Sequence, residues 1–482
     1  MGILDLSGAI KSENVIKPKN VTKPETMTKP ETMTKTETMT KTETMTKTCD
    51  AYKPKSETDP MTQTHPMIGR NLRIDSDRLW QSLMDIAKIG PGVAGGNNRQ
   101  ALTDDDSTAR HLFQSWCAAE GLSFHTDKMG NMFARREGSD ASLPPVMVGS
   151  HLDTQPTGGK YDGPLGVLAA LEIIRSLNEA GLATRHPIEI VNWTNEEGCR
   201  FAPPMMASGV FAGVHDLDWA YDRTDAAGAR FGDELERIGW VGDAAVGGRP
   251  VAAFFELHIE QGPILEDSKT DIGVVTHGQG LNWIRVTLTG KEAHTGSTPM
   301  PSRVNAGLGM AQITVLAHQI ALAHAPHAVG AVGHCEIFPN STNIIPGKAI
   351  FTIDFRSPNP AVIAAMHDEL RTGASAIAKT LGLGIDFELA GAFDPVAFDP
   401  ACIDRVRAAA DRLGYSHMDL VSGAGHDAFW MSRVAPTAMI MCPCVDGLSH
   451  NEAEEISQDW AAASANVLFH AVVETAGLVS DD

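Results

Sequence analysis

Four short apolar stretches of this chain each run into a histidine or a carboxylate, and this repetition constrains the fold more than any other feature. The stretches are residues 145–148, 187–193, 252–257 and 437–442. Brief apolar runs bounded by turn residues are typical of buried strands. Ligands bind at the carboxyl ends of the strands of an open α/β sheet, so we expect the polar side chains to meet at one edge. These side chains are His151, Glu196, Glu197, His258 and His450.

The segment GSHLDTQPTGGKYDG, residues 149–163, adds two carboxylates to the first strand end. Side chains alternate along an extended chain, so we expect Asp153 to point the same way as His151 and to orient its imidazole. Asp162 lies beside Gly163, and Pro164 suits the first position of a following helix that ends near Gly181. This placement predicts a carboxylate at a helix N-terminus with both oxygens free.

Adjacent acids follow the second strand. Glu196 and Glu197 repel each other unless a cation or a shared proton stabilises them. Hydrolytic metal sites use such a pair, because one carboxylate binds metal while the other accepts a proton from water. His258 and Glu260 repeat the alternation of the first strand end, followed by Gln261. A lone histidine among 18 in the chain is weak evidence, but the repetition predicts a metal site.

The hydrophobic pattern changes at Gly280 and changes back near Phe393. Residues 280–392 predict the order strand, helix, strand, strand, helix, strand, with helices over residues 304–324 and 360–381. This order is typical of an α+β domain with helices on one face of an antiparallel sheet. We therefore predict an α/β catalytic domain built from residues 70–279 and 393–482, with residues 280–392 inserted into it as a small α+β domain.

The first 69 residues differ from the rest of the chain. From Thr22 the hexad TKPETM occurs twice and TKTETM twice. Such a tract cannot bury a core, so we predict a disordered, low-complexity extension at residues 1–69. Globular sequence begins near Asn71, with expected helices over residues 76–90, where Ser76 is a candidate cap, and 103–121.

Net charge and cysteine usage exclude several classes of protein. The net charge of −21 argues against nucleic acid and against an anionic membrane surface as partners. The seven scattered cysteines form no disulfide framework or zinc-finger spacing. No uninterrupted run of about 18 apolar residues and no signal-peptide core is found. We therefore expect a cytoplasmic protein.

Seven motifs together resemble a known family, the amidase, hydantoinase and carbamoylase branch of the di-metal exopeptidase superfamily. This branch includes N-carbamoyl-L-amino acid hydrolases, β-ureidopropionases and allantoate amidohydrolases. The resemblance covers about residues 72–478. It rests on the motifs HLDTQPTGGKYDG, NEEG, HIEQGP, GKEAHTGSTPM, PNSTNIIPG, DFRSP and SGAGHDA.

The resemblance implies a role for each ligand candidate. His151, Asp162 and His258 would bind one divalent ion, and Asp162, Glu197 and His450 the other, with Asp162 shared. Glu196 would be the general base and Asp153 the residue that orients His151. Mixed imidazole and carboxylate ligands suit zinc, manganese, cobalt or nickel, and ligand type does not choose among them.

The resemblance implies a catalytic domain with a mixed sheet and flanking helices, and a dimerisation or lid role for residues 280–392. It also implies substrate contacts. His294 would reach the active site of the second subunit of a homodimer and hold the oxyanion. Arg356 would clamp the substrate carboxylate with a two-pronged hydrogen bond, for which a planar guanidinium is suited; the alternative for Arg356 is an ion pair with a nearby aspartate. The remaining pocket residues would be Gln261, Asn343, Gly423 and Gly425. His426 and Asp427 would support the site or be merely structural.

The reaction implied is attack of water on a ureido carbonyl, which converts an N-carbamoyl amino acid into the amino acid, carbon dioxide and ammonia. The sequence leaves open whether the substrate is an N-carbamoyl-L-amino acid or N-carbamoyl-β-alanine. Allantoate hydrolysis, an aminoacylase or peptidase activity, and a non-catalytic metal-binding role are the alternatives. The HIEQGP motif favours the carbamoylase branch over peptidases, which typically carry an acid where this chain has His258.

Overall fold

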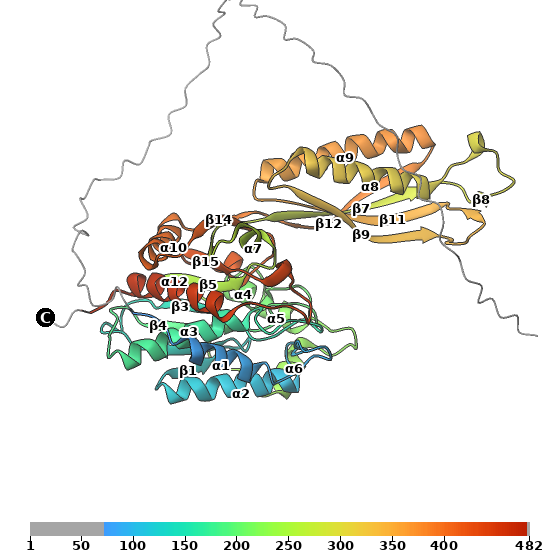
Figure 1. Ribbon diagram of the computed structural model, residues 1–482. Helices are drawn as coiled ribbons and strands as arrows, with labels where there is room; N and C mark the ends of the chain where they lie inside the picture. The colour runs from blue at the N-terminus through green and yellow to red at the C-terminus, as the bar shows by residue number, and fades with distance from the viewer. Residues whose placement is uncertain (1–71, 480–482) are drawn as a thin grey trace, which may run out of the picture. The chain divides into compact units, whose positions relative to one another are not determined.

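The computed structural model describes residues 72–479, so the expected extension at residues 1–69 lies outside the described residues (Figure 1). Within residues 72–479 the strands form a nine-stranded sheet, a four-stranded sheet and a two-stranded ladder. The two larger sheets have separate clusters of buried apolar side chains.

The nine-stranded sheet has the order β1-β2-β4-β3-β5-β15-β6-β13, and β14 pairs with β6. The run β4-β3-β5-β15 is parallel, whereas β1, β2 and β13 pair antiparallel with their neighbours. The sheet is therefore mixed, as predicted. Its strands are β1 (Ser123–Thr126), β2 (Met132–Arg136), β3 (Val146–His151), β4 (Ile188–Trp193), β5 (Ala253–Ile259), β6 (Ile272–Gly278), β13 (Val396–Ala397), β14 (His417–Ser422) and β15 (Thr437–Cys442).

Helices flank this sheet, which confirms the α/β class. Two of them, α3 and α12, are buried along most of their length, because their sequences are apolar on nearly every side. The long helices are α1 (Ser76–Ile86), α2 (Asp104–Ala119), α3 (Pro164–Glu179), α10 (Pro400–Leu413) and α12 (Gln458–Ala476). The short ones are α4 (Met206–Phe211), α5 (Leu217–Tyr221), α6 (Phe231–Arg237), α7 (Ile264–Ser268), α11 (Asp427–Met431) and the 3-10 turn η3 (Val445–Gly447).

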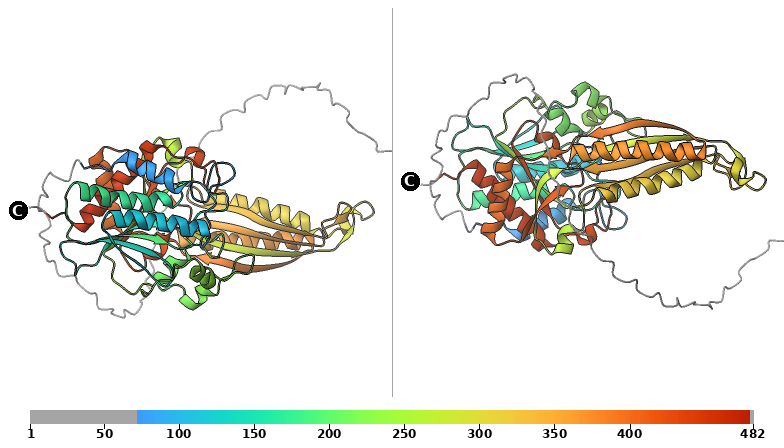
Figure 2. Two further views of the ribbon diagram at one scale, coloured as in Figure 1. Left: turned by 90° about the horizontal axis from the view of Figure 1, so that it is seen from below. Right: turned by 90° about the horizontal axis from the view of Figure 1, so that it is seen from above.

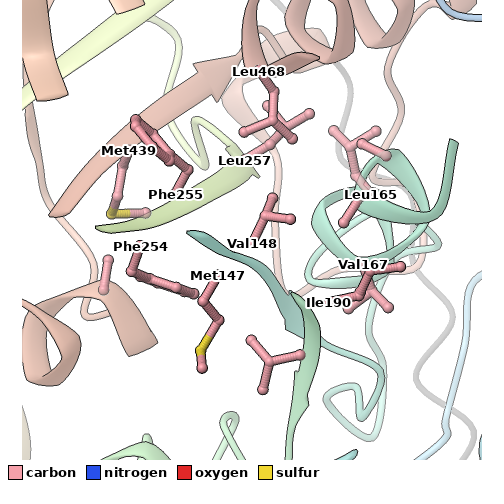
Figure 3. Packing of buried hydrophobic residues seen from close by; sticks show 14 of the residues in the cluster. Met147, Val148, Leu165, Val167, Ile190, Phe254, Phe255, Leu257, Met439 and Leu468 are labelled. Carbon is pink, nitrogen blue, oxygen red and sulfur yellow. The ribbon is translucent and has the colours of Figure 1, made fainter. Parts of the chain in front are cut away.

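The core packs the central strands against α3 and α12 (Figure 3). Val148 of β3 and Leu257 of β5 are fully buried, as are Leu165 of α3 and Leu468 of α12. Strands covered on both faces are apolar throughout rather than alternating, and all six residues of β3 are buried. This packing holds the ends of the parallel strands in place.

The four-stranded sheet, order β12-β7-β11-β9, is antiparallel throughout. Two long helices, α8 and α9, cover one of its faces (Figure 2). The observed order of elements matches the expected one, with an additional short ladder between β8 and β10. The bounds are β7 (Gly280–Thr289), β8 (Ala293–His294), η2 (Met300–Ser302), α8 (Ala306–Ala323), β9 (Val329–Phe338), β10 (Ile344–Ile345), β11 (Lys348–Ser357), α9 (Pro360–Leu381) and β12 (Gly384–Phe393).

Helix α8 is apolar yet largely exposed. By length and composition alone it is the one helix of the described residues that could cross a membrane, with only 33% of its residues buried. Ile313 and Ala317 pack into the small core, as in a core helix, whereas Val315 and Leu322 are 55% and 62% exposed. Polar residues interrupt the helix, for example His318.

One helix cap differs from the sequence expectation. Asp75, not Ser76, caps α1, because its side chain accepts a hydrogen bond from the backbone N–H of Arg78. A carboxylate in this position can bond a free N–H of the first turn and also interacts favourably with the helix dipole. Ser76 is instead the first residue of the helix.

Candidate metal centre and active site

The carboxyl ends of four adjacent parallel strands carry the ligand candidates. His151 ends β3, and His258 lies near the end of β5. The Glu196–Glu197 pair follows β4, and His450 follows β15. Because β4, β3, β5 and β15 are neighbours that run in one direction, all of these side chains emerge at the same edge of the sheet.

A first ligand group consists of His151, Asp162 and His258, all buried. The Asp162 Oδ1 atom lies 3.5 Å from His151 Nε2 and 3.1 Å from His258 Nε2. The ligand atoms of the group all lie within 4.8 Å of one another. One ion could therefore be held by two imidazoles and a carboxylate.

A second group consists of Asp162, Glu197 and His450. The Asp162 Oδ2 atom lies 3.7 Å from His450 Nε2, which is 3.5 Å from Glu197 Oε2. Asp162 thus presents one oxygen to each group, as expected for a shared carboxylate. His450 differs from the other four because its side chain is 52% exposed.

The backbone at Gly163 sets the approach of Asp162 to His151. Gly163 has φ of +82° and directly precedes α3, whose first residue is Pro164. A Cβ atom on Gly163 would overlap the His151 ring. Only glycine satisfies both the left-handed backbone and this close contact.

The charges of the site are unbalanced without a cation. Burial, reinforced by the charge of Asp427, raises the pKa of Glu196 well above its ordinary value, although His151 opposes this. Burial and the charge of Asp162 raise the pKa of Glu197 to about 8. Burial would also raise the pKa of Asp162, but His258 and His151 lower it well below its ordinary range. Buried acids this close are stabilised by a cation or by a proton.

The donor set fits divalent metal ions. Imidazole nitrogens and carboxylate oxygens converge, and His151 Nε2 is buried without a hydrogen-bond partner among the described residues. A buried polar atom left unpaired in this way needs an explanation, and a metal ion provides one. We conclude that the residues present fit two metal ions.

Asp153 makes a different contact from the expected one. Its backbone carbonyl, not its carboxylate, accepts from His151 Nδ1 at 2.8 Å, and the carboxylate Oδ1 lies 3.9 Å away. The carboxylate instead accepts the backbone N–H groups of Glu196 (3.2 Å) and Glu197 (3.3 Å). Asp153 therefore positions the His151 imidazole through its carbonyl and the backbone of the Glu196–Glu197 pair through its carboxylate.

The same substitution of a carbonyl for a carboxylate occurs at His258. Its Nδ1 atom bonds the carbonyl of Ile259 at 2.9 Å. The carboxylate of Glu260 accepts the backbone N–H groups of Ile264 and Leu265, both at 2.8 Å, at the start of α7. Strand alternation thus did not predict the hydrogen-bond partners of Asp153 and Glu260.

Glu196 lies inside the ligand cluster. Its Oε2 atom is 3.5 Å from His151 Nε2, and the residue is 7% exposed. Its backbone N–H donates to the Asp153 carboxylate. A buried carboxyl group with a raised pKa beside a ligand cluster is suited to proton transfer.

Two of the expected substrate-binding residues, Arg356 and Gly423, are joined by a hydrogen bond. The Arg356 guanidinium is paired with Asp354, with an Nη2 to Oδ2 distance of 2.8 Å, and its Nη1 donates to the carbonyl of Gly423 at 3.0 Å. The alternative ion pair with an aspartate is therefore present. A Cβ atom on Gly423 would meet nothing within 4 Å, whereas one on Gly425 would lie 2.7 Å from Met205 Cε.

Gln261 contacts the ligand cluster directly. Its Nε2 atom donates to Asp162 Oδ2 at 2.7 Å, and its φ of +58° is left-handed. A cavity of about 1160 Å³ is lined by Gln261 and Gly423, among other residues. Gln261 thus lies between the shared carboxylate and this cavity.

His294 and Asn343 lie together at the short β8–β10 ladder. His294 is the second residue of β8 and pairs with Ile344, next to Asn343. Its Nδ1 atom accepts the backbone N–H groups of Gly296 and Ser297 at 3.0 and 3.2 Å. Within residues 72–479 no hydrogen bond or ion pair joins either residue to the ligand cluster.

Three polar residues that contact the ligands were not anticipated from the sequence: Gln155 and Ser449 are half-buried, and Glu454 is buried. Gln155 Nε2 donates to Glu197 Oε2 at 2.6 Å, and Ser449 Oγ donates to Asp162 Oδ2 at 2.8 Å. Glu454 accepts the backbone N–H of Asp162 at 3.1 Å. The run of acids after His450 was the available signal, but it did not distinguish buried Glu454 from its exposed neighbour Glu455.

His426 and Asp427 are both buried beside the ligands. The His426 ring lies 4.3 Å from the His258 ring, measured between centroids. Asp427 accepts a hydrogen bond from Ser208 Oγ at the start of α11. Glu256, also buried, accepts Ser150 Oγ at 2.7 Å and the backbone N–H of Ala428 at 2.9 Å. These contacts tie α11 to the ends of β3 and β5.

Comparison with known proteins agrees with this geometry. Residues 147–474 match the Peptidase family M20/M25/M40. The N-carbamoyl-L-amino-acid amidohydrolase of Rhizobium meliloti is 62% identical over 85% of this chain and 99% of that protein. The N-carbamoyl-L-amino acid amidohydrolase of Geobacillus stearothermophilus is 36% identical over 84% of this chain and 99% of that protein. The crystal structure of an amidase of the hydantoinase/carbamoylase family from Burkholderia multivorans is 53% identical, with a TM-score of 0.82, over 84% of this chain and 98% of that one. This chain therefore belongs to the Peptidase family M20/M25/M40 and, within it, resembles the hydantoinase/carbamoylase amidases.

Proposed function

We propose that this hydrolase removes the carbamoyl group from N-carbamoyl-L-amino acids. The observation that carries the proposal is the ligand cluster with a buried carboxyl group beside it, on a chain that is 62% identical to a protein of that name. The products would be the amino acid, carbon dioxide and ammonia. N-Carbamoyl-β-alanine and allantoate are the alternative substrates, from which N-carbamoyl-L-amino acids must be distinguished by experiment.

The proposal assigns the metal ligands by their geometry. His151, Asp162 and His258 would hold one ion, and Asp162, Glu197 and His450 a second. Zinc, manganese, cobalt and nickel all suit this donor set. When bound, such ions polarise a carbonyl group and lower the pKa of water.

Glu196 is the proposed general base. It would accept a proton from the attacking water, whose oxygen bonds to the ureido carbonyl carbon. It would then return that proton to the amino nitrogen as the bond between carbon and this nitrogen breaks. The carbamic acid released decomposes to carbon dioxide and ammonia. Asp153 supports this step because its carboxylate holds the Glu196 backbone N–H at 3.2 Å.

Arg356 is the proposed clamp for the substrate carboxylate. Its guanidinium is held by Asp354 and by the carbonyl of Gly423, and a substrate carboxylate would have to share or replace these partners. Gln261, Gly423 and Gly425 would line the same pocket, and the glycines would leave space for the ligand backbone. Pocket volume, not the clamp, would distinguish α- from β-amino acids.

We also propose that residues 280–392 form an inserted domain and that this domain mediates a homodimer. The exposed apolar side chains of α8 include Val315 and Leu322. Helix α8 contacts the edge strand β9, where Val329 is 48% exposed. Apolar surface of this kind is typical of protein interfaces. In such a dimer, His294 and Asn343 of one subunit would complete the pocket of the other.

A reducing, cytoplasmic setting is proposed because the cysteines of the described residues are free thiols.

The test is ammonia release from N-carbamoyl-L-methionine, N-carbamoyl-β-alanine and allantoate by the metal-reconstituted protein. An EDTA-treated sample is the control. Preference for N-carbamoyl-L-methionine, lost in EDTA, would support the proposal. Preference for either other substrate would refute the assigned substrate class. Silence on all three, with two metal ions bound per chain, would favour a peptidase, an acylase or a binding role.

A further inference from the structure

Glu454 lies behind the second ligand group and contacts two of the three loops that build it. It is 3% exposed and belongs to the loop after β15 that also carries His450. The second loop, residues 154–163 between β3 and α3, carries Asp162. Glu454 is not itself a candidate metal ligand, since it is absent from both ligand groups of the described residues.

One carboxylate oxygen of Glu454 holds the backbone of the Asp162 loop. Oε1 accepts the backbone N–H groups of Tyr161 and Asp162, both at 3.1 Å. Both donors are buried residues, and an unpaired buried N–H is costly. The Asp162 backbone therefore has a defined position only while this acceptor is present.

The other oxygen faces the residue that precedes His450. Ser449 Oγ lies 3.2 Å from Glu454 Oε2 and 2.8 Å from Asp162 Oδ2. Gln261 Nε2 lies 3.2 Å from the same hydroxyl. The Glu454 side chain thus reaches the Asp162 carboxylate through Ser449, in addition to holding the Asp162 backbone directly.

The chain makes room for this contact. A Cβ atom on Gly159 would overlap the Glu454 carboxylate, so the Asp162 loop carries no side chain where Glu454 enters. His450 itself has a left-handed backbone, with φ of +53°. A loop in such a conformation depends on contacts from its surroundings. Glu454 provides one of these contacts four residues further along.

We propose that Glu454 is a positioning residue that joins the two ligand loops and directs the Asp162 carboxylate toward both ligand groups. The inference rests on the proposed function, because it assumes that Asp162 is the shared ligand. Residues that orient a ligand in this way affect metal affinity strongly, by roughly 10- to 100-fold on removal. The loss should be larger for the second group, whose His450 is exposed and loop-borne.

The experiment compares Glu454→Ala, Glu454→Gln and a matched control, Glu455→Gln, in the full chain. Glu455 is the next residue, is exposed and bonds the Tyr161 hydroxyl at 2.8 Å, not the Asp162 backbone. Each metal-free protein is titrated with cobalt(II). Binding affinity and the visible absorption of bound cobalt are measured, because this absorption reports ligand geometry. Thermal unfolding of each metal-free protein is recorded in EDTA.

We expect Glu454→Ala to weaken cobalt binding roughly 10- to 100-fold and to change the absorption spectrum. Glu454→Gln should recover most of the affinity, because an amide oxygen can still accept the two backbone N–H groups. Glu455→Gln should match the wild type.

Three results would overturn the proposal. The first is wild-type cobalt affinity and absorption in Glu454→Ala. The second is a loss in Glu455→Gln equal to that in Glu454→Ala. The third is a lower unfolding temperature of metal-free Glu454→Ala with unchanged cobalt binding, which would assign Glu454 a purely structural role. Failure of the wild-type chain to bind cobalt would refute the proposed function together with this inference.

Discussion

Replacing Glu196 with glutamine tests the central chemical assignment with little disturbance of structure. Glutamine has nearly the same volume, and the backbone N–H of residue 196 would still donate to Asp153. The side chain would remain beside His151, whose Nε2 atom is 3.5 Å from Glu196 Oε2. The variant therefore removes the ability to accept a proton and leaves the other contacts in place.

The magnitude follows from how often Glu196 acts. One proton transfer by a positioned side chain contributes roughly 10²- to 10⁴-fold in rate. Glu196 is assigned both the acceptance and the return of a proton, so we expect kcat to fall by roughly a thousandfold or more, or about 4 kcal/mol in activation free energy. Metal content should stay at the wild-type level, because Glu196 belongs to neither ligand group among the described residues.

The assay is ammonia release at saturating N-carbamoyl-L-methionine, with metal content measured by elemental analysis on the same samples. Glu455→Gln is again the control, since it makes the same chemical change on an exposed acid that does not contact the ligands. A Glu196→Gln enzyme with full metal content and kcat within about tenfold of the wild type would refute the general-base assignment.

Three further predictions concern metal binding, substrate binding and pH. His151→Ala should reduce the metal content to roughly one ion per chain or less, which elemental analysis after dialysis would show; unchanged content would contradict the ligand assignment. Arg356→Lys should raise KM roughly 10- to 100-fold with a smaller change in kcat, because an ammonium group cannot make the two-pronged contact. The control is Arg285→Lys, at an exposed arginine paired with Glu388, and steady-state kinetics would decide. Burial raises the pKa of Asp127 to about 7, so this carboxyl group takes up a proton on folding between about pH 4 and pH 7. Relative to Asp127→Asn, the free energy of unfolding of the wild type should therefore fall as pH rises through this window, by up to about 1.4 kcal/mol per pH unit. The free energy of unfolding is measured by urea unfolding at several pH values. If it changed with pH in the same way in the two proteins across this window, the raised pKa of Asp127 would be refuted.

The elements that could be predicted are those with a local signature. Apolar runs ending in turn residues identified β3, β4, β5 and β15, and the periodicity of residues 360–381 gave α9 with its observed bounds. The histidines and acids at the strand ends were also visible in the sequence. They share an edge because ligands collect at the carboxyl ends of parallel strands.

Other features depend on partners that are distant along the chain. Alternation predicted a contact between the Asp153 carboxylate and His151. In the structure the Asp153 carbonyl bonds His151, and the carboxylate accepts from the backbone of the acidic pair. Nothing local separates Glu454 from Glu455. Glu454 is buried against the backbone of the Asp162 loop, whereas Glu455 stays exposed and accepts only the Tyr161 hydroxyl of that loop.

The sequence by itself determined the class of fold, because this depends on short-range periodicity. It also determined the residue types of the site and the family resemblance, because these rest on motifs that are continuous along the chain. The tertiary structure decided the strand order β4-β3-β5-β15, the distances of the two Asp162 carboxylate oxygens from the histidines, and the burial of Glu454. Distances between segments hundreds of residues apart are set by how the sheet and its loops pack, and no local pattern encodes them.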